Sequence, residues 1–343
     1  MKKINNTLYI ISPDRYLSLD GENVVISDKS EKIGRIPLQN IDGIIAFESL
    51  GISPALMGKC VSENKFVVFE NRYGGFLASV EGNLSGNVLL RRKQYRIADD
   101  QSVSLDIARN IIMSKLYNSR WVLERTKRDH KLRIDENLFS EKSRQIKELT
   151  LRTTKTVSMD ELRGIEGEAA NIYFSVFDEM ILQQKDDFKF LNRNRRPPLD
   201  KVNALLSFSY AIVTNMCASA LRTAGLDPYV GFMHVDRPGR MSLALDLVEE
   251  FRAILCDRFV LSLINKKIIG AKDFSEAENG AVSLNEEGKK AFIASWQAKK
   301  QEEITHPFIE EKVQWGMIPY VQALLLARYL RGDLDAYPPF LWK

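Results

Sequence analysis

The sequence predicts an α+β protein, in which a β-sandwich-like N-terminal domain is followed by an all-α domain. Short runs of β-branched and aromatic residues with close turns fill residues 1–92. From about Arg91 onward, glycine and proline become sparse and apolar residues recur at helical spacing. The length of 343 residues also favours two domains over one. We therefore expect a β-rich domain at 1–92 and a helical domain at 93–343.

Strands are expected wherever short apolar runs stand between turn residues. Residues 16–19 and 23–26 flank Asp20-Gly21, a dipeptide typical of hairpin turns. Ser53 and Pro54 predict the start of a short helix, because serine caps a helix and proline suits its first turn. Further strands are expected at residues 8–11, 41–47, 66–69 and 76–80. Together these elements predict a small sandwich.

The second domain is predicted from long stretches with helical periodicity. Helices are expected at about residues 107–130, 160–182, 202–222, 243–263 and 307–330. The breaks between them contain Pro197-Pro198 and Pro238-Gly239. The closing heptapeptide YPPFLWK is too apolar for a free end, so we expect it to pack against a partner or against the chain's own core.

Composition narrows the class of protein. Apolar residues make up 45% and charged residues 27% of the chain, which is ordinary for a soluble protein. No apolar run approaches the roughly 20 residues of a membrane span, so no membrane association is expected. Cys60, Cys217 and Cys256 are scattered along the chain. This spacing argues against a disulfide framework or a zinc site and favours a reducing cytoplasm.

Positive charge is concentrated in one segment. Residues 91–155 contain 17 Lys plus Arg against 9 Asp plus Glu, a net charge of +8 on a chain whose total is +4. Such a segment suggests a polyanionic partner. The alternative is a solvated helix face, because lysine and arginine are good helix formers. Charge alone leaves both interpretations open.

Two local clusters offer side chains for chemistry. Gly164 and Gly167 bracket Glu166 near the start of a helix, which leaves room beside the carboxylate for a backbone, a ligand or a metal. The alternative is close helix packing with an exposed glutamate. Residues 227–234 form a turn and an extended stretch that ends at His234. A lone histidine is more often structural than a ligand.

A third cluster lies on the helix expected at residues 243–263. Asp246 and Glu249 are three residues apart, so they lie on one helix face. Carboxylates among apolar residues repel each other and are costly to bury, and either a divalent cation or Arg252 could relieve them. One imidazole with two or three carboxylates suits Mg²⁺ or Mn²⁺ better than zinc. Hard cations of this kind serve phosphoryl transfer.

The order of four segments carries a family resemblance. They are GIEGEAANIYF at 164–174, VNALLSFSYAIV at 202–213, AGLDPYVGFMH at 224–234 and SLALDLVEEFR at 242–252. Over essentially its whole length the chain resembles the universal integrase/endonuclease subunit of CRISPR spacer acquisition. RNRRPPLD at 193–200 and the closing YPPF resemble the type I-C branch.

This resemblance implies an architecture and a set of partners. The β-sandwich would serve dimerisation and support of DNA ends, and the helical domain would be catalytic and metal-dependent. The chain would form a homodimer, and two such dimers would flank a dimer of a small ferredoxin-like CRISPR-associated partner in a heterohexamer. The compartment would be the prokaryotic cytoplasm.

The resemblance also implies site residues. The family's metal-binding glutamate and histidine fall on Glu166 and His234, and its third ligand falls on Glu249, where many relatives have aspartate. Asp246 would be the supporting carboxylate among the catalytic residues. Glu250 follows Glu249 directly but lies about 100° further around the helix, so it ranks lower.

The implied reaction is integration of DNA. A metal held by these residues, Mg²⁺ or Mn²⁺, would promote attack by the 3′-hydroxyl of a captured double-stranded fragment on a phosphodiester of the CRISPR repeat. One phosphodiester replaces another, which fits the absence of a phosphate-binding GxxxxGK[ST] loop. Basic residues would bind DNA without sequence preference. The candidates are Arg91, Arg92, Arg163, Arg237, Arg240 and Arg252.

Two other functions stay open at this point. A metal-dependent nuclease acting on branched or damaged DNA would use the same ligands to activate water. A non-catalytic DNA-binding scaffold would leave Glu166, His234 and Glu249 without a role.

Overall fold

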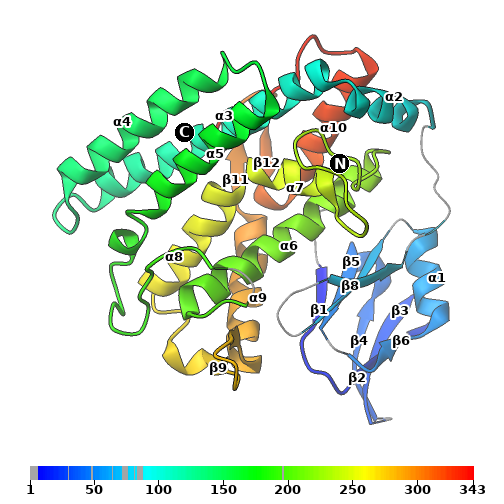
Figure 1. Ribbon diagram of the computed structural model, residues 1–343. Helices are drawn as coiled ribbons and strands as arrows, with labels where there is room; N and C mark the ends of the chain where they lie inside the picture. Colours follow the sequence, from blue (N-terminus) through cyan, green and yellow to red (C-terminus); the bar gives the residue numbers. More distant parts are fainter. Residues whose placement is uncertain are drawn as a thin grey trace. The chain divides into compact units, whose positions relative to one another are not determined.

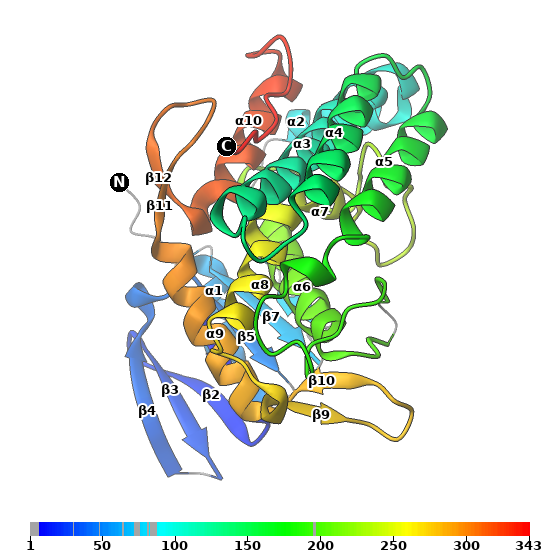
Figure 2. The same ribbon diagram turned by 90° about the vertical axis from the view of Figure 1, so that its left-hand side faces the viewer.

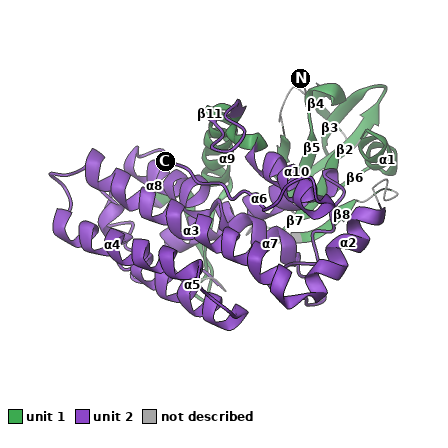
Figure 3. Cartoon of the chain, turned by 90° about the horizontal axis from the view of Figure 1, so that it is seen from above, with its two compact units in different colours: residues 1–85, 272–304, 314–317 green, residues 86–271, 305–313, 318–343 purple. Residues whose placement is uncertain are grey.

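The computed structural model describes most of the chain and divides it into two compact units (Figure 3). The described residues are 7–29, 31–47, 49–63, 65–71, 76–80, 82, 88–194 and 197–343. Arg195 and Arg196, within the RNRRPPLD stretch, lie outside them. Unit 1 comprises Met1–Ser85, Lys272–Ile304 and Gln314–Met317. Unit 2 comprises Gly86–Ala271, Thr305–Val313 and Ile318–Lys343.

Unit 1 is built on two four-stranded sheets (Figure 1). One has the order β1-β5-β7-β8, with β1 (Thr7–Ile10), β5 (Gly43–Phe47) and β7 (Phe66–Glu70) parallel and β8 (Phe76–Val80) antiparallel. The other has the order β4-β3-β2-β6, from β2 (Arg15–Asp20), β3 (Asn23–Asp28), β4 (Glu31–Pro37) and β6 (Gly51–Ile52). Leu17 and Val24 of one sheet share a buried core with Ile44 and Val67 of the other. The sandwich-like N-terminal fold is therefore confirmed.

Local signals in unit 1 formed as predicted. The β2–β3 hairpin turns at Asp20-Gly21, where Gly21 has a positive φ of 58°. Helix α1 (Pro54–Ser62) begins after Ser53, whose hydroxyl accepts a hydrogen bond from the backbone N–H of Leu56 at 3.3 Å. The sequence analysis did not predict β4, whose seven residues include three charged ones and none that is buried.

A second part of unit 1 comes from residues late in the chain. Helix α9 (Glu286–Gln301) follows the hairpin of β9 (Phe274–Glu276) and β10 (Val282–Leu284), which lies beside the start of the helix (Figure 2). The side chain of Gln297 donates a 2.6 Å hydrogen bond to the carbonyl oxygen of Thr7. This contact ties α9 to the first strand. No sequence signal predicted that the two segments would meet.

Unit 2 is a helical assembly. Its helices are α2 (Val88–Asp99), α3 (Gln101–Asp129), α4 (Glu136–Thr153), α5 (Met159–Phe174), α6 (Lys201–Thr223), α7 (Ser242–Glu249), α8 (Arg258–Asn265) and α10 (Ile318–Arg331). Helices α3, α4 and α5 lie side by side (Figure 1 and Figure 2). The α+β fold class is confirmed, with strands first and a largely helical remainder.

Several predicted helices differ from the observed ones. The helix expected at 243–263 is three pieces, since the π-helical segment Arg252–Asp257 separates α7 from α8. The helix expected at 307–330 begins only at Ile318, because β11 (Glu303–Thr305) and β12 (Lys312–Gln314) precede it. Residues 93–343 are thus not all-helical. The helix expected at 160–182 ends at Phe174, and α4 was not predicted.

Helix α6 corrects the expectation that no segment is long and apolar enough for a membrane span. Lys201–Thr223 passes that test by length and composition alone. However, 67% of its most apolar window is buried inside the structure. A core helix that contacts neighbours on most sides has this pattern.

The C-terminal tail closes the core of unit 2. Tyr337 and Phe340 are fully buried, and Trp342 nearly so. The carboxylate of Glu250 accepts hydrogen bonds from the Tyr337 hydroxyl and, at 2.6 Å, from the backbone N–H of Phe340. Asn118 donates at 2.8 Å to the carbonyl oxygen of Phe340 and accepts from the backbone N–H of Trp342 at 2.9 Å. The expectation that the tail packs is confirmed, against the chain's own core.

Replacing Phe340 by alanine should therefore destabilise the protein. We expect Phe340→Ala to lower the free energy of unfolding by about 3–5 kcal/mol, because it leaves a cavity between Phe251 and His306, which its ring contacts edge-on. Guanidinium titration followed by circular dichroism measures this. The matched control is Phe308→Ala, since Phe308 is 49% exposed. Equal losses in the two variants would contradict a structural role of the tail.

Candidate active site

Glu166 lies on α5 with open space beside it. Helix α5 starts at Met159 because the hydroxyl of the preceding Ser158 accepts a 3.2 Å hydrogen bond from the backbone N–H of Glu161. Within the described part of the chain, a Cβ at Gly164 or Gly167 would meet no atom of another segment within 4 Å. Among the residues that the structure describes, no second backbone approaches the two glycines, so the space beside them is open to a ligand. The Glu166 side chain is 27% exposed.

His234 is held by the buried carboxylate of Asp246. Oδ1 of Asp246 accepts from the backbone N–H of His234 at 3.0 Å and lies 2.7 Å from its Nδ1. Oδ2 accepts from the backbone N–H groups of Phe232 and Met233 at 2.6 and 3.0 Å. Because an ionised carboxylate only accepts, the proton of a neutral His234 lies on Nδ1, and Nε2 keeps its lone pair.

Glycine at position 231 makes this close approach possible. A Cβ there would stand 2.8 Å from Asp246 Oδ2 and 2.9 Å from the backbone of Ser242. Both distances are shorter than van der Waals contact, so a larger residue would push the His234 segment away from α7. In the sequence VGFMH, the glycine is therefore required for close packing against α7, in addition to the histidine that follows it.

Glu249 ends α7 and is almost fully buried. Its Oε1 lies 3.0 Å from Nη2 of Arg252, and its Oε2 lies 2.8 Å from Nζ of Lys115. Burial by itself raises the pKa of this carboxyl, but the charges of Arg252, Lys115 and His234 outweigh it and lower the pKa to about 2. Glu249 is therefore ionised at neutral pH.

Lys115 of α3 joins two of the candidate residues. Its Nζ forms ion pairs with Glu166 on α5 and with Glu249 on α7. The Lys115 side chain is only 12% exposed. Sequence reasoning missed it, although one signal was present: Lys115 follows Ile111 by one turn on the buried face of α3.

A cavity of about 520 Å³ is lined by Glu166 and by Lys115, which pairs with both Glu166 and Glu249. Lys115, Arg193 and Arg252 place three positive charges on its wall, and Glu166 and Asp257 contribute carboxyl groups. The other lining residues include Gly167, Asn171, Phe174, Asn192 and Tyr210. Its charge and size suit a phosphate group together with a neighbouring sugar or base.

Asp257 is a buried carboxyl at the cavity wall. The Tyr210 hydroxyl donates to its Oδ1 at 2.6 Å. Burial raises the pKa of Asp257 to about 6, although hydrogen bonds from Tyr210 and Tyr173 and the charge of Arg193 act in the opposite direction. This group titrates well above the ordinary range of aspartate.

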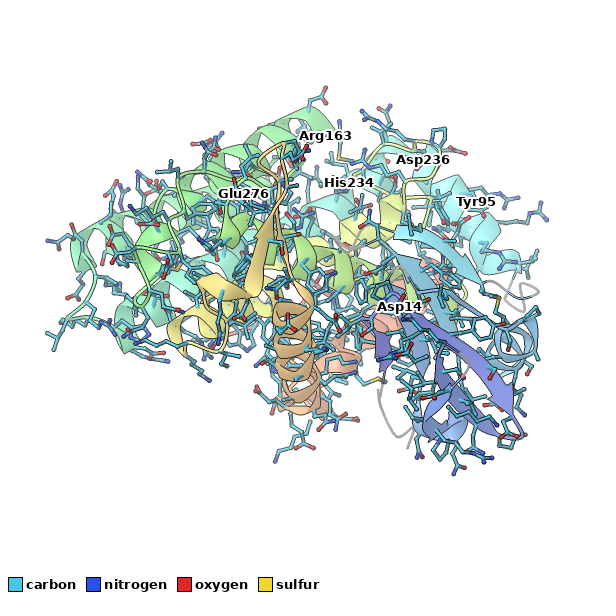
Figure 4. All side chains as sticks on the ribbon, turned by 90° about the horizontal axis from the view of Figure 1, so that it is seen from below. Asp14, Tyr95, Arg163, His234, Asp236 and Glu276 are labelled. Carbon is cyan, nitrogen blue, oxygen red and sulfur yellow. The ribbon has the colours of Figure 1, made fainter. Side chains whose placement is uncertain are left out.

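The arginines predicted to bind DNA occupy four different settings. Arg163 of α5 donates a 2.8 Å hydrogen bond to the carbonyl oxygen of Met233, next to His234 (Figure 4). Arg252 pairs with Glu249. Arg237 and Arg240 lie in the turn before α7, and Arg91 and Arg92 lie on α2. Arg92 lines a separate cavity of about 460 Å³ with Lys93 and Arg96.

The donor chemistry fits a hard divalent cation. Glu166 and Glu249 supply ionisable oxygens, and His234 supplies a ring nitrogen whose tautomer is fixed by Asp246. The Asp246 carboxylate forms its four hydrogen bonds with residues 232–234. This suits a residue that orients His234 and does not itself bind the metal. In the part of the chain that is described, no three His, Cys, Asp or Glu side chains are already gathered at metal-binding spacing.

Comparison with known sequences gives extensive matches. A family model described as "CRISPR associated protein Cas1" matches residues 8–298. The chain is 47% identical to "CRISPR-associated endonuclease Cas1 1" of Chlorobaculum tepidum and 45% identical to "CRISPR-associated endonuclease Cas1 2" of Rhodospirillum rubrum, over 100% of both chains in each pair. It is 41% identical to a relative from Moorella thermoacetica, over 98% of each chain.

Solved structures share the fold. A casposase bound to an integration product has a TM-score of 0.83 at 23% identity, covering 98% of this chain and 94% of the other. A CAS1 protein from Thermotoga maritima has a TM-score of 0.80 at 23% identity, covering 95% and 97%. At this level of identity, the likeness establishes the fold.

The raised pKa of Asp257 predicts a pH-dependent stability. Its pKa lies at about 6 in the folded chain against an ordinary 3.8, so its stabilising contribution is complete below pH 3.8 and is lost as the pH rises through 6. Asp257→Asn removes this titration. Across that window, the free energy of unfolding of the wild type should fall by about 3 kcal/mol relative to the variant. Denaturant titrations at several pH values measure it, and a constant difference would refute the assignment.

Proposed function

The chain belongs to the Cas1 family of CRISPR-associated endonucleases, and on that premise we propose that it is a DNA integrase of spacer acquisition. The 3′-hydroxyl of a captured double-stranded fragment attacks a phosphodiester of the CRISPR repeat. One P–O bond forms and one breaks, which leaves a new junction and a freed 3′ end. No energy cofactor is required.

The observation that carries this proposal is the meeting of Glu166 and Glu249 at one cationic centre. The two carboxylates come from α5 and α7, and Lys115 Nζ forms ion pairs with both. His234 is held by Asp246, which lies one turn before Glu249 on α7. Ligands that are far apart in the sequence thus lie in one neighbourhood, beside a cavity with cationic walls.

We assign metal binding to Glu166, His234 and Glu249, and the metal is Mg²⁺ or Mn²⁺. When bound, such an ion would polarise the scissile phosphate and neutralise the charge that develops in the transition state. Asp246 keeps the Nδ1 proton on His234 and so leaves the lone pair of Nε2 available to a metal. Arg252 holds Oε1 of Glu249, which fixes the orientation of this carboxylate.

Cationic side chains would position the DNA. Arg252 and Arg193 line the cavity next to the carboxylates and suit the reacting phosphates. Arg237 and Arg240 lie between His234 and α7, and Arg163 of α5 contacts the same segment through the carbonyl oxygen of Met233. Arg91 and Arg92 on α2 would bind the backbone further away, without reading its sequence.

The finer assignments follow the family. We propose a homodimer, with residues 1–92 serving dimerisation and support of DNA ends and residues 93–343 serving catalysis. Two dimers would bind a dimer of a small ferredoxin-like partner and form a heterohexamer in a prokaryotic cytoplasm. The RNRRPPLD and YPPF stretches favour the type I-C branch.

Glu166→Ala should abolish integration and leave DNA binding intact. We expect strand transfer of a labelled duplex into a supercoiled plasmid carrying a repeat to fall about 100-fold or more, measured with the small partner and Mn²⁺. Glu168→Ala is the matched control, because Glu168 lies on the same helix, is 54% exposed and pairs with Arg152.

Three outcomes of this assay decide the function. Joined products from the wild type and the control, but not from Glu166→Ala, support the integrase. Cut plasmid without joined products would favour a nuclease that activates water at the same site. Normal joining by Glu166→Ala would show that the site is wrong.

The basic residues of α2 predict a salt-dependent affinity for DNA. Arg92→Ala should weaken binding of unrelated duplexes to a similar extent and reduce the slope of log K against log salt by about 1. Fluorescence anisotropy at several salt concentrations measures both. Arg144→Ala is the control, since Arg144 is engaged by Glu141 and Glu148 on α4. An unchanged slope in Arg92→Ala would remove α2 from the DNA-binding surface.

A further inference from the structure

Lys115 occupies the position between the two carboxylates that are assigned to the metal. Its Nζ pairs with Oε1 of Glu166 and lies 2.8 Å from Oε2 of Glu249. Oε1 of Glu249 is held by Arg252 at 3.0 Å. On Glu249, the oxygen that Arg252 leaves for a divalent cation is therefore the one that Lys115 contacts, and on Glu166 Lys115 contacts Oε1.

The charges of this group balance without any other ion. Glu166 and Glu249 contribute two negative charges, and Lys115 and Arg252 contribute two positive ones. Lys115 and Glu249 are both largely withdrawn from solvent, where ion pairs are only weakly screened. A divalent cation that joined the group with Lys115 still in place would add two uncompensated positive charges next to an ammonium. Displacement of one of the two resident cations would relieve this repulsion.

The two resident cations differ in how easily they can leave. Arg252 stacks over the ring of Tyr210 with its Cζ 4.9 Å from the ring centroid, and its planar guanidinium is fixed on both sides. Lys115 carries its charge on a flexible four-carbon stem and lines the 520 Å³ cavity. The ammonium therefore has space to move into, and Arg252 does not need to move.

We propose that Lys115 is a built-in competitor of the metal: its ammonium holds Glu166 and Glu249 together, is displaced from both when the divalent cation binds, and turns into the adjoining cavity. There, the positive charge faces the space assigned to the DNA phosphate. Lys115 thus lowers the affinity for the free metal. It also couples binding of the metal to binding of DNA, because a phosphate stabilises the displaced ammonium. This inference rests on the proposed metal site.

The test is metal affinity without DNA. Lys115→Met keeps the apolar stem and removes the charge, so the Kd for Mn²⁺ should fall about tenfold, since affinity at such sites follows the charge of the ligand set. The variant should melt at a lower temperature than the wild type without metal and gain more from added Mn²⁺. Isothermal titration calorimetry and thermal unfolding measure these effects independently of activity.

Two further variants make the result specific. Lys127→Met is the matched control on the same helix, because Lys127 pairs with Glu124 at 3.0 Å, and its Kd for Mn²⁺ should stay unchanged. Lys115→Arg retains the charge but is harder to displace, so its Kd should equal or exceed that of the wild type. It also serves as the test if Lys115→Met does not fold.

The outcomes separate this inference from the proposed function. If the wild type binds Mn²⁺ no better than Glu166→Ala, the metal site itself is wrong. If the wild type binds Mn²⁺ and Lys115→Met binds it equally or more weakly, or Lys115→Arg binds it more tightly, competition by Lys115 is refuted. A lower Kd in Lys115→Met alone supports it.

Discussion

Three buried carboxylates within five residues impose the main constraint on unit 2. Asp246, Glu249 and Glu250 are each at most 3% exposed, although carboxyl groups are costly to withdraw from water unless they are paired. Each is compensated by a different part of the chain. Asp246 binds the backbone of residues 232–234, Glu249 binds Lys115 and Arg252, and Glu250 binds the tail. Helix α7 therefore brings together segments that share no local sequence signal.

Helix α3 supplies the other half of this arrangement. Lys115 and Asn118 are three residues apart and lie on one face, so the same turn serves Glu249 and the tail. Asn118 also donates to the carbonyl oxygen of Glu250 at 2.8 Å, just before the π-helical segment. The position of Glu249 thus depends on α3, on Arg252 and, through its neighbour Glu250, on Tyr337 and Phe340. A tail that looks remote in the sequence helps to fix the candidate active site.

Predictions from periodicity and turn chemistry held where a segment's structure is decided locally. The turn at Asp20-Gly21, the start of α1 at Ser53 and the span of α6 are of this kind. The predictions failed where contacts with a distant part of the chain determine the backbone conformation. The predicted helix at 243–263 gives way to a π-helical segment after Glu250, whose carboxylate is held by the tail. The segment before Ile318 was predicted to be helical, but its residues 312–314 form strand β12, which pairs with β11.

The sequence by itself determined the fold class, the family through four ordered segments, and the identity of the candidate ligands through that resemblance. The residue pattern around α7 left open whether a metal or Arg252 compensates the negative charges of Asp246 and Glu249. Only the tertiary structure decided their partners: Asp246 holds His234, and Glu249 meets Arg252 and Lys115. Spacing along a helix shows which side chains share a face. It does not show which distant residue will meet them, since the pairing of buried charges is fixed by the packing of helices that lie far apart in the chain.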